Sequence, residues 1–324
     1  MSPRIAGVLV VAAAPMLALS AACGPTAEAG PAAALRALAG DSAAILDDLR
    51  FLSADALGGR GTGSEGSRTA RDYLVAGFAE AGIQPLEGAF EHTFTWTRRG
   101  QDQERTGVNV LGIVPGTEIP GRFVVLSAHY DHVGIRDGVI FNGADDNASG
   151  AVGLLALARA VRSRPLRHSL VVAAWDAEEV GLRGARAFVS RPPVPLESVA
   201  VNLNLDMIAR TGGVLWAGGA AHTPALRPIL EAVAEAAPVE LRLGHDQPDA
   251  PEGDDWTGSS DHGAFHGVGI PFVYLGVEDH EDVHQPTDDF ENVAPGEYMN
   301  ALRTALLTLL ALDQELSPTQ EPGS

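Results

Sequence analysis

The sequence predicts a single three-layer α/β/α domain with a central mixed, mostly parallel β-sheet. Apolar runs of strand length alternate with segments of helical spacing from about residue 40 to residue 315, which is typical of sheets covered by helices. Residues 169–175 form a continuous β-type run, as expected of a central strand buried on both faces. With 324 residues and 45% hydrophobic content, the chain has ample material for such a core.

The first half of this domain is predicted to contain two helices followed by three strands. Asp41 is a suitable N-cap for a helix that runs to Ala54, and Ser64 or Ser67 caps a second helix that closes at Gly82. Residues 90–96 alternate apolar and polar side chains, which is the pattern of a half-buried strand. Two more strands are predicted at residues 108–114 and 123–126.

The second half begins with a helix at residues 151–161, whose leucines recur at helical spacing. Further strands are predicted at residues 169–175, 201–205 and 271–275, and further helices at 223–237 and 295–312. Residues 243–260 are acidic and contain proline and glycine, so a surface loop is expected there.

The N-terminus has the pattern of an export signal. A positive start is followed by an apolar run at residues 5–19, too short for a membrane span, and then by small residues up to the lone Cys23. We expect residues 1–22 to be a signal peptide, 23–39 a flexible tether, 40–315 the folded domain and 316–324 a disordered tail. The position of Cys23 resembles a bacterial lipoprotein box, which implies a lipidated cell-envelope protein; ordinary cleavage after Ala22 and secretion is the alternative.

The overall charge limits the partners. The formal net charge is -20 at pH 7 and the sequence contains no lysine, so nucleic acid and anionic lipid surfaces would be repelled. Cationic groups such as peptide amino termini would be attracted weakly, although solubility alone explains the charge equally well.

Residues able to bind metal follow the predicted strands. They are His129 and Asp131, Glu178 and Glu179, Asp206, and His284, with Asp146 in the turn before a helix. Each alone has an ordinary explanation, such as a surface histidine or a helix cap. Because the carboxyl ends of parallel strands meet at one edge of a sheet, we expect all of them in one crevice. Such a cluster is costly without cations, and histidine with carboxylate suits zinc, manganese or cobalt, so two divalent ions are predicted.

Seven short segments together resemble a known family. They are residues 59–66 (GRGTGSEG), 127–132 (SAHYDH), 143–150 (GADDNASG), 176–182 (DAEEVGL), 204–208 (NLDMI), 260–262 (SDH) and 284–288 (HQPTD). These segments are similar to those of the secreted double-zinc aminopeptidases, metallopeptidase family twenty-eight, which includes bacterial leucyl aminopeptidases. The resemblance runs from about Leu49 to Leu312 and implies the fold that zinc aminopeptidases share with phosphorylases.

The resemblance also implies a role for each matching residue. His129 and Asp206 would hold one zinc ion, Glu179 and His284 the other, and Asp146, rather than its neighbour Asp145, would bridge both. Asp131 would accept a hydrogen bond from the His129 ring, and Glu178 would be the general base. A cis peptide is expected between Asp146 and Asn147. Many relatives carry a tyrosine where this chain has Val283, so either the metals alone or Tyr274 would stabilise the oxyanion.

The implied activity is hydrolysis of the peptide bond after a free N-terminal residue. The substrates would be peptides with a free N-terminus, the cofactors two Zn²⁺ ions per chain, and the protein a monomer. The alternatives are a glutaminyl cyclase-like acyltransferase with one zinc ion, a carboxypeptidase or deacylase of the same clan, and a non-catalytic binding ectodomain.

Overall fold

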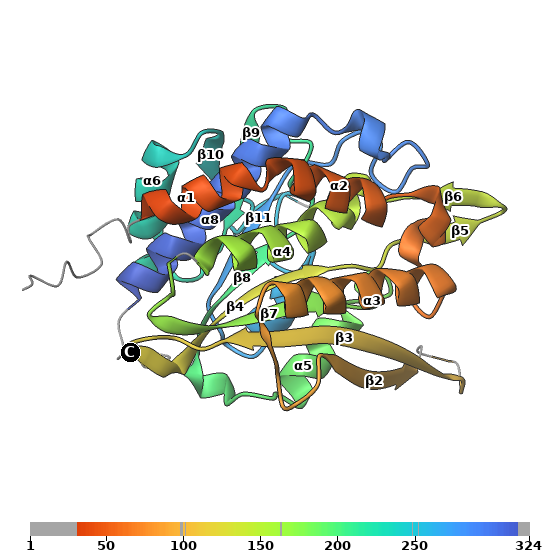
Figure 1. Cartoon of the computed structure of the whole chain (residues 1–324), viewed down its shortest axis with the longest axis horizontal. Coiled ribbons are helices and arrows are strands. Elements are labelled where there is room, and N and C mark those ends of the chain that lie inside the picture. Colours follow the sequence, from red (N-terminus) through yellow and green to blue (C-terminus); the bar gives the residue numbers. More distant parts are fainter. Residues whose placement is uncertain are drawn as a thin grey trace, which may run out of the picture.

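The computed structural model describes residues 31–316 except 98, 99, 101, 163, 248 and 252. These residues form a nine-stranded sheet covered by helices on both faces, and a separate two-stranded hairpin (Figure 1). The three-layer arrangement predicted from the alternation of apolar segments is confirmed. The predicted signal peptide, Cys23 and residues 317–324 of the predicted tail lie outside the described residues.

The strands of the large sheet lie in the order β1-β3-β7-β4-β8-β11-β9-β10, with β2 paired to β3. Their bounds are β1 Gln84–Pro85, β2 Glu91–Thr97, β3 Glu104–Val114, β4 Ile119–His129, β7 His168–Trp175, β8 Val199–Leu205, β9 Val214–Gly218, β10 Glu240–Leu243 and β11 Phe272–Gly276. The central strands β7, β4, β8 and β11 are parallel, whereas β3 pairs antiparallel with β7 and β9 antiparallel with β11. The predicted mixed sheet is therefore confirmed, with parallel pairing among the four central strands and again between β9 and the edge strand β10.

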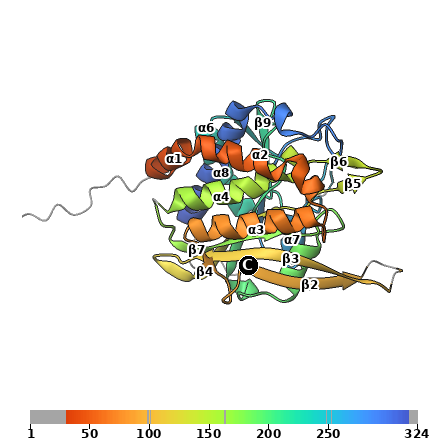
Figure 2. The ribbon, with the colours of Figure 1, turned by 45° about the vertical axis from the view of Figure 1, so that its right-hand side comes forward.

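One face of the sheet carries many more helices than the other. One face carries α1 Pro31–Gly40, α2 Ser42–Leu52, α3 Glu65–Glu80, α4 Gly150–Val161, α6 Arg227–Ala236 and α8 Pro295–Glu315. The other carries the short helices α5 Arg183–Ser190 and α7 His262–His266. Figure 2 shows α1, α2, α4 and α3 side by side over the sheet. The short segments are η1 Asp55–Arg60, η2 Ala144–Ser149, η3 Leu196–Ser198, η4 Pro224–Leu226 and η5 Phe290–Asn292, and the hairpin is β5 Gly134–Arg136 with β6 Val139–Phe141.

Strand β7 shows how the sequence produces two cores. All eight of its residues are buried. Leu170, Val172 and Ala174 pack in the larger core under α4, and Val171, Ala173 and Trp175 pack in the smaller core under α5 and α7. Because successive strand residues point to opposite faces, an uninterrupted apolar run places this strand between two helical layers.

The predicted flexible tether at residues 23–39 is wrong for its described part. Residues 31–40 form helix α1, and Ala34 and Leu38 are fully buried against the rest of the core. These two side chains are four residues apart, so they lie on one face of a helix and can pack on α4 and α8. The alanine-rich composition was interpreted as a linker, but it also favours helix.

Besides α1, the sequence-based prediction lacked the strands β1, β5, β6, β9 and β10 and the helices α5 and α7. The Ser64 cap is confirmed, since its hydroxyl accepts a hydrogen bond from the Ser67 N–H at 3.0 Å. Within the described part of the chain, no helix combines the length and the apolar character needed to cross a bilayer.

Candidate metal centre

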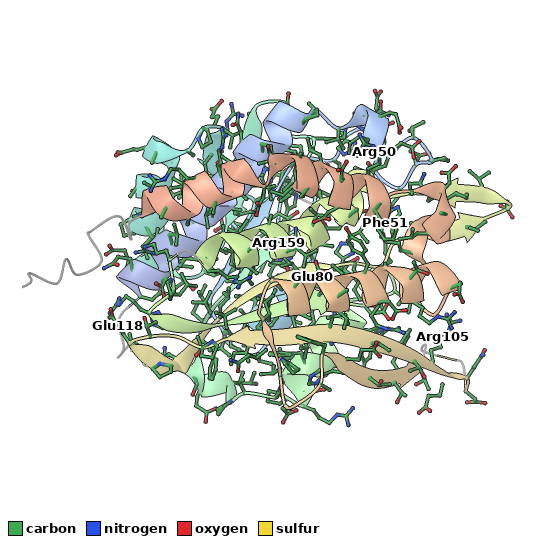
Figure 3. All side chains as sticks on the ribbon, in the orientation of Figure 1. Arg50, Phe51, Glu80, Arg105, Glu118 and Arg159 are labelled. Atoms are coloured by element: carbon green, nitrogen blue, oxygen red, sulfur yellow. The ribbon has the colours of Figure 1, made fainter. Side chains whose placement is uncertain are left out.

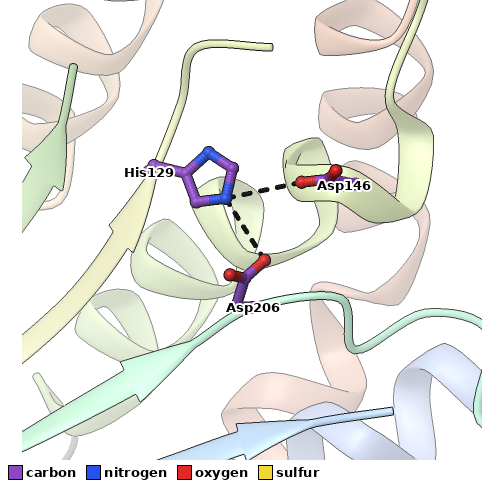
Figure 4. Close-up of side chains that lie close together, drawn as sticks. All are labelled: His129, Asp146 and Asp206. Carbon is purple, nitrogen blue, oxygen red and sulfur yellow. Dashed lines mark hydrogen bonds and ion pairs between the residues drawn. The ribbon is translucent and has the colours of Figure 1, made fainter. Parts of the chain in front are cut away.

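The carboxyl end of β4 delivers His129 into a buried site. Its Nε2 lies 3.2 Å from Asp206 Oδ1, at the end of β8, and 3.4 Å from Asp146 Oδ1, in the turn before α4. Figure 4 shows the three side chains pointing toward one another from these separate segments. All three are buried, and their nitrogen and oxygen atoms are close enough together to bind one metal ion.

The orientation of the His129 ring differs in detail from the expectation. Its Nδ1–H donates to the main-chain carbonyl of Asp131 at 3.1 Å, whereas the Asp131 carboxylate is 3.8 Å away. Asp131 therefore accepts the hydrogen bond of the His129 ring as predicted, through its main-chain carbonyl and not its carboxylate. This bond orients the ring so that Nε2 is the nitrogen that faces Asp146 and Asp206.

The turn that carries Asp146 is held by its neighbours. The peptide between Asp146 and Asn147 is cis, as predicted. Asn147 accepts a hydrogen bond from the Gly150 N–H at 2.8 Å and donates one to the Leu205 carbonyl at 2.9 Å. The Asp288 carboxylate accepts from the N–H groups of Asp145 at 2.9 Å and Asp146 at 3.0 Å. Asp146 is thereby fixed between two groups of ligands.

The second group lies on the other side of Asp146. The His284 Nε2 is 3.1 Å from Asp146 Oδ2 and 3.2 Å from Glu179 Oε2. Together with the first group, the structure thus brings His129, Asp146, Glu179, Asp206 and His284 into one crevice.

His132 is a further member that the sequence interpretation did not select. It is almost completely buried, and its Nδ1 lies 2.7 Å from Glu179 Oε1 and 3.6 Å from Asp146 Oδ2. Neither ring nitrogen of His132 nor Glu179 Oε1 is aligned for a hydrogen bond. Buried polar atoms without partners are rare, and a cation between them would satisfy both. The signal was available, because His132 ends the same SAHYDH segment as His129.

Asp145 has a structural role although it is the neighbour of Asp146. Its Oδ1 accepts the Ala209 N–H at 2.6 Å, and its Oδ2 lies 3.0 Å from His280 Nε2. His280 belongs to the loop that leads to His284, and the same loop is held by an ion pair between Asp282 and Arg210. These contacts position the loop that carries His284, whose side chain is half exposed.

Arg60, in the glycine-rich segment at residues 59–66, has a structural role near the site. Its buried guanidinium donates to the carbonyls of Tyr130 at 2.9 Å, Leu52 at 2.6 Å, Asn142 at 2.5 Å and Gly143 at 2.9 Å. Burial lowers its pKa to about 10, so it stays charged at neutral pH. One cation therefore links the segment after β4 to the turn that carries Asp146.

Glu178 belongs to neither group of ligands. Its N–H donates to Asp131 Oδ1 at 3.0 Å, and Asp131 Oδ2 accepts from the Thr62 hydroxyl at 3.0 Å. Burial raises the pKa of the Glu178 carboxyl well above its usual range, with the negative charges of Asp261 and Asp206 adding to the effect. The Asp131 carboxylate thus positions the segment of Glu178 rather than the ring of His129.

Asp261 adds a fully buried carboxyl beside the first group. Neither of its oxygens has a hydrogen-bond partner among the described residues, and burial raises its pKa to about 7. It follows Ser260, whose hydroxyl accepts from Asn204 Nδ2 at 2.9 Å, and Asn204 Oδ1 accepts from Ser127 at 2.7 Å. This buried chain connects the SDH segment to β4 and β8.

Val283 stands where many relatives have a tyrosine, and the hydroxyl of Tyr274, its possible replacement, is already engaged in a hydrogen bond. The Tyr274 hydroxyl donates to the main-chain carbonyl of Asp206 at 3.3 Å, and Val283 packs against the larger core. Positive φ angles occur directly next to ligands, at Met207 (56°), and at the ligand His284 itself (53°). Such backbone conformations are uncommon for residues other than glycine and cluster at functional sites.

The chain is similar in sequence to one protein family and in fold to solved structures. The profile of Peptidase family M28 matches residues 109–309. Aminopeptidase YwaD of Bacillus subtilis is 31% identical over 201 residues, covering 59% of this chain and 41% of that protein, so the chain spans less than half of this relative's length.

Two solved structures share the fold at low sequence identity. A zinc aminopeptidase from Bacillus subtilis aligns with a TM-score of 0.66 and 17% identity, covering 87% of this chain and 97% of the other. The glutaminyl cyclase of Porphyromonas gingivalis aligns with a TM-score of 0.62 and 19% identity, covering 88% and 98%. The predicted family resemblance and α/β fold are confirmed.

Proposed function

This chain belongs to peptidase family M28, and from that premise we propose that it removes N-terminal residues from peptides by metal-dependent hydrolysis. The observation that carries the proposal is the crevice where His129, Asp146, Glu179, Asp206 and His284 meet beside a carboxyl, Glu178, that touches neither group of ligands. The relative from Bacillus subtilis, named an aminopeptidase, supports the same reading.

The ligand set fits two zinc ions. His129 and Asp206 would hold one ion, Glu179 and His284 the other, and Asp146 would contribute an oxygen to each. Imidazole and carboxylate are ordinary zinc ligands, and the buried atoms of His132 and Glu179 that lack hydrogen-bond partners fit a site that binds a cation. When bound, zinc polarises a substrate carbonyl and lowers the pKa of water to about 7.

The protein side chains would supply the proton transfers. Glu178 would accept a proton from the attacking water and deliver it to the departing amine. Burial raises the pKa of Glu178 above its usual value, which makes its carboxylate a stronger base for this exchange. Asp131 would keep Glu178 in place through the Glu178 N–H.

The acidic side of the crevice favours a free amino terminus. The carboxyls of Glu178 and of the unpartnered Asp261 lie beside the first group of ligands, to which Asp206 itself belongs. A substrate ammonium would be attracted there, whereas a blocked N-terminus would carry no compensating charge. This is the basis for proposing an exopeptidase.

A panel of aminoacyl anilides combined with zinc measurement tests the proposal. We expect about two zinc ions per chain, release of the N-terminal residue, and loss of activity on chelation. A protein that retains its metal but cleaves no substrate with a free N-terminus would contradict it.

The fold likeness to a glutaminyl cyclase supports one alternative. That enzyme class would need one zinc ion and would cyclise N-terminal glutamine. The presence of both His129 and Asp206 favours the two-metal hydrolase. Cyclisation of glutaminyl peptides with a single bound zinc ion would support the alternative.

We also propose that the protein is exported and anchored through a lipid on Cys23, and that it acts as a monomer on peptides. The sequence of residues 1–23 supports export. Detergent phase partitioning of the native protein and of a Cys23→Ser variant tests the anchor.

A further inference from the structure

A cavity of about 900 Å³ opens beside the second group of ligands. One end is formed by Asp131, His132 and Glu179, so the cavity is continuous with the proposed metal centre. From there it runs between the segment around η1 and the start of α3, the β2–β3 hairpin, and strand β5. Figure 3 shows Arg105, one of its lining residues, toward the tip of the β2–β3 hairpin. This volume is at the upper end for small-ligand pockets, which span roughly 300–1,000 Å³.

Exposed apolar side chains gather at this groove. Among the described residues, the large hydrophobic side chains that are exposed are Phe51, Ile135, Val139, Val180 and Val268. Ile135, 59% exposed, and Val180, 42% exposed, both line the groove, and Val139 lies in the hairpin that contains Ile135. Trp96 lines the groove from β2. Apolar surface concentrated next to a site indicates a ligand that covers it.

The groove carries more acidic than basic side chains, so its charge disfavours an acidic peptide. Its basic side chains are Arg105 and Arg136, and its acidic ones are Asp55, Glu65, Glu104, Asp131 and Glu179. The buried carboxyl of Asp261, whose oxygens have no hydrogen-bond partner among the described residues, lies beside the first group of ligands. A peptide whose ammonium is held on that side would have its remaining residues directed past Glu179 and into the groove.

The positions of Val180 and Ile135 in the sequence limit how far they lie from the ligands Glu179 and His132. Val180 directly follows Glu179, and Ile135 is three residues after His132. Three extended residues span at most about 10 Å, and an extended substrate covers the same distance with the same number of residues. Val180 and Ile135 therefore both lie within reach of the first three residues after the cleaved bond.

We propose that this groove binds the departing peptide in extended form, so that the protein prefers oligopeptides with an apolar residue two or three positions after the cleaved bond. The inference rests on the proposed aminopeptidase function and adds its substrate class. The occupant is a peptide, because the groove continues from the ligands and is longer than one residue needs.

The test compares kcat/KM for Leu-Gly-Gly-Gly, Leu-Gly-Leu-Gly and Leu-p-nitroanilide with the zinc-loaded protein. We expect the apolar tetrapeptide to exceed the glycine peptide about tenfold, the factor for burying part of a leucine side chain. Ile135→Ser should lower this ratio at least about threefold. Val268→Ser changes another exposed apolar side chain, which does not line the groove, and should leave the ratio unchanged.

The outcomes separate the two proposals. Cleavage of the anilide with equal rates for both tetrapeptides would overturn the groove assignment and leave the aminopeptidase proposal intact. Failure to cleave any of the three substrates would overturn both. A change of sedimentation coefficient in Ile135→Ser without a change in the peptide ratio would assign the groove to a second copy of this chain and would also overturn the inference.

Discussion

Replacement of Glu178 by glutamine separates proton transfer from metal binding. The side chain keeps its size, loses its basicity, and belongs to neither group of ligands. General base catalysis contributes typically about 10²–10⁴-fold, so kcat should fall by that factor, equivalent to about 3–5 kcal/mol of lost transition-state stabilisation. Zinc content should stay at the wild-type level.

The pH dependence gives a second readout for the same variant. Burial shifts the pKa of Glu178 upward from its usual value, and a base works only when it is deprotonated. Wild-type kcat should therefore decline as the pH falls through this raised pKa and should reach a plateau above it. The residual activity of Glu178→Gln should lack that decline, because the titrating group is gone.

The adjacent residue provides a matched control. Glu179→Gln makes the same chemical change one position along, but it weakens a carboxylate that contacts His132 and His284. It should lower zinc content and activity together. The two variants are compared by stopped-assay kinetics, atomic absorption and thermal melting. If Glu178→Gln kept more than a tenth of wild-type kcat, or lost its zinc, the assignment of Glu178 as the base would be refuted.

Three further variants test the scaffold. Arg60→Met should destabilise the fold by roughly 3 kcal/mol in chemical denaturation, because it leaves buried carbonyls such as that of Gly143 unpaired; an unchanged midpoint would contradict this. Gly66→Ala should unfold the chain or yield none in soluble form, since a Cβ would lie 1.6 Å from the Leu57 carbonyl oxygen, and normal expression would disprove the packing. Asp313→Asn should cost about 1–3 kcal/mol at neutral pH, because Asp313 accepts hydrogen bonds from His168 that outweigh the effect of burial and lower its pKa. This stabilisation is present above the unfolded pKa near 3.9 and disappears as the pH falls through the lower folded value, so a difference that persists in acid would contradict the linkage.

The wrong prediction of a flexible tether at residues 23–39 shows that composition alone does not decide secondary structure. Residues 31–39 contain no strong helix cap and many alanines, so their sequence is compatible with either a linker or a helix. Helix α1 exists because Ala34 and Leu38 find partners on α4 and α8. Tertiary burial decided this segment, since an isolated helix of that length is marginal in water.

The chain by itself determined the fold class and which residues could gather. Strand and helix periods are local properties, and residues at the ends of parallel strands share one edge of the sheet whatever the details of packing. The gathering of His129, Asp206 and His284 was predictable for that reason, whereas the choice of Asp146 and Glu179 over their neighbours came from the family resemblance.

Only the tertiary structure decided which atom each of these residues meets. It placed the carbonyl rather than the carboxylate of Asp131 on the His129 ring, and it turned His132 toward Glu179. It also gave Asp145 different partners from Asp146, because the Asp145 carboxylate contacts His280 and the main-chain N–H of Ala209. Side-chain direction in a turn depends on segments that are distant in sequence, as Ala209 and His280 are from Asp145, and no local pattern records where those segments pack.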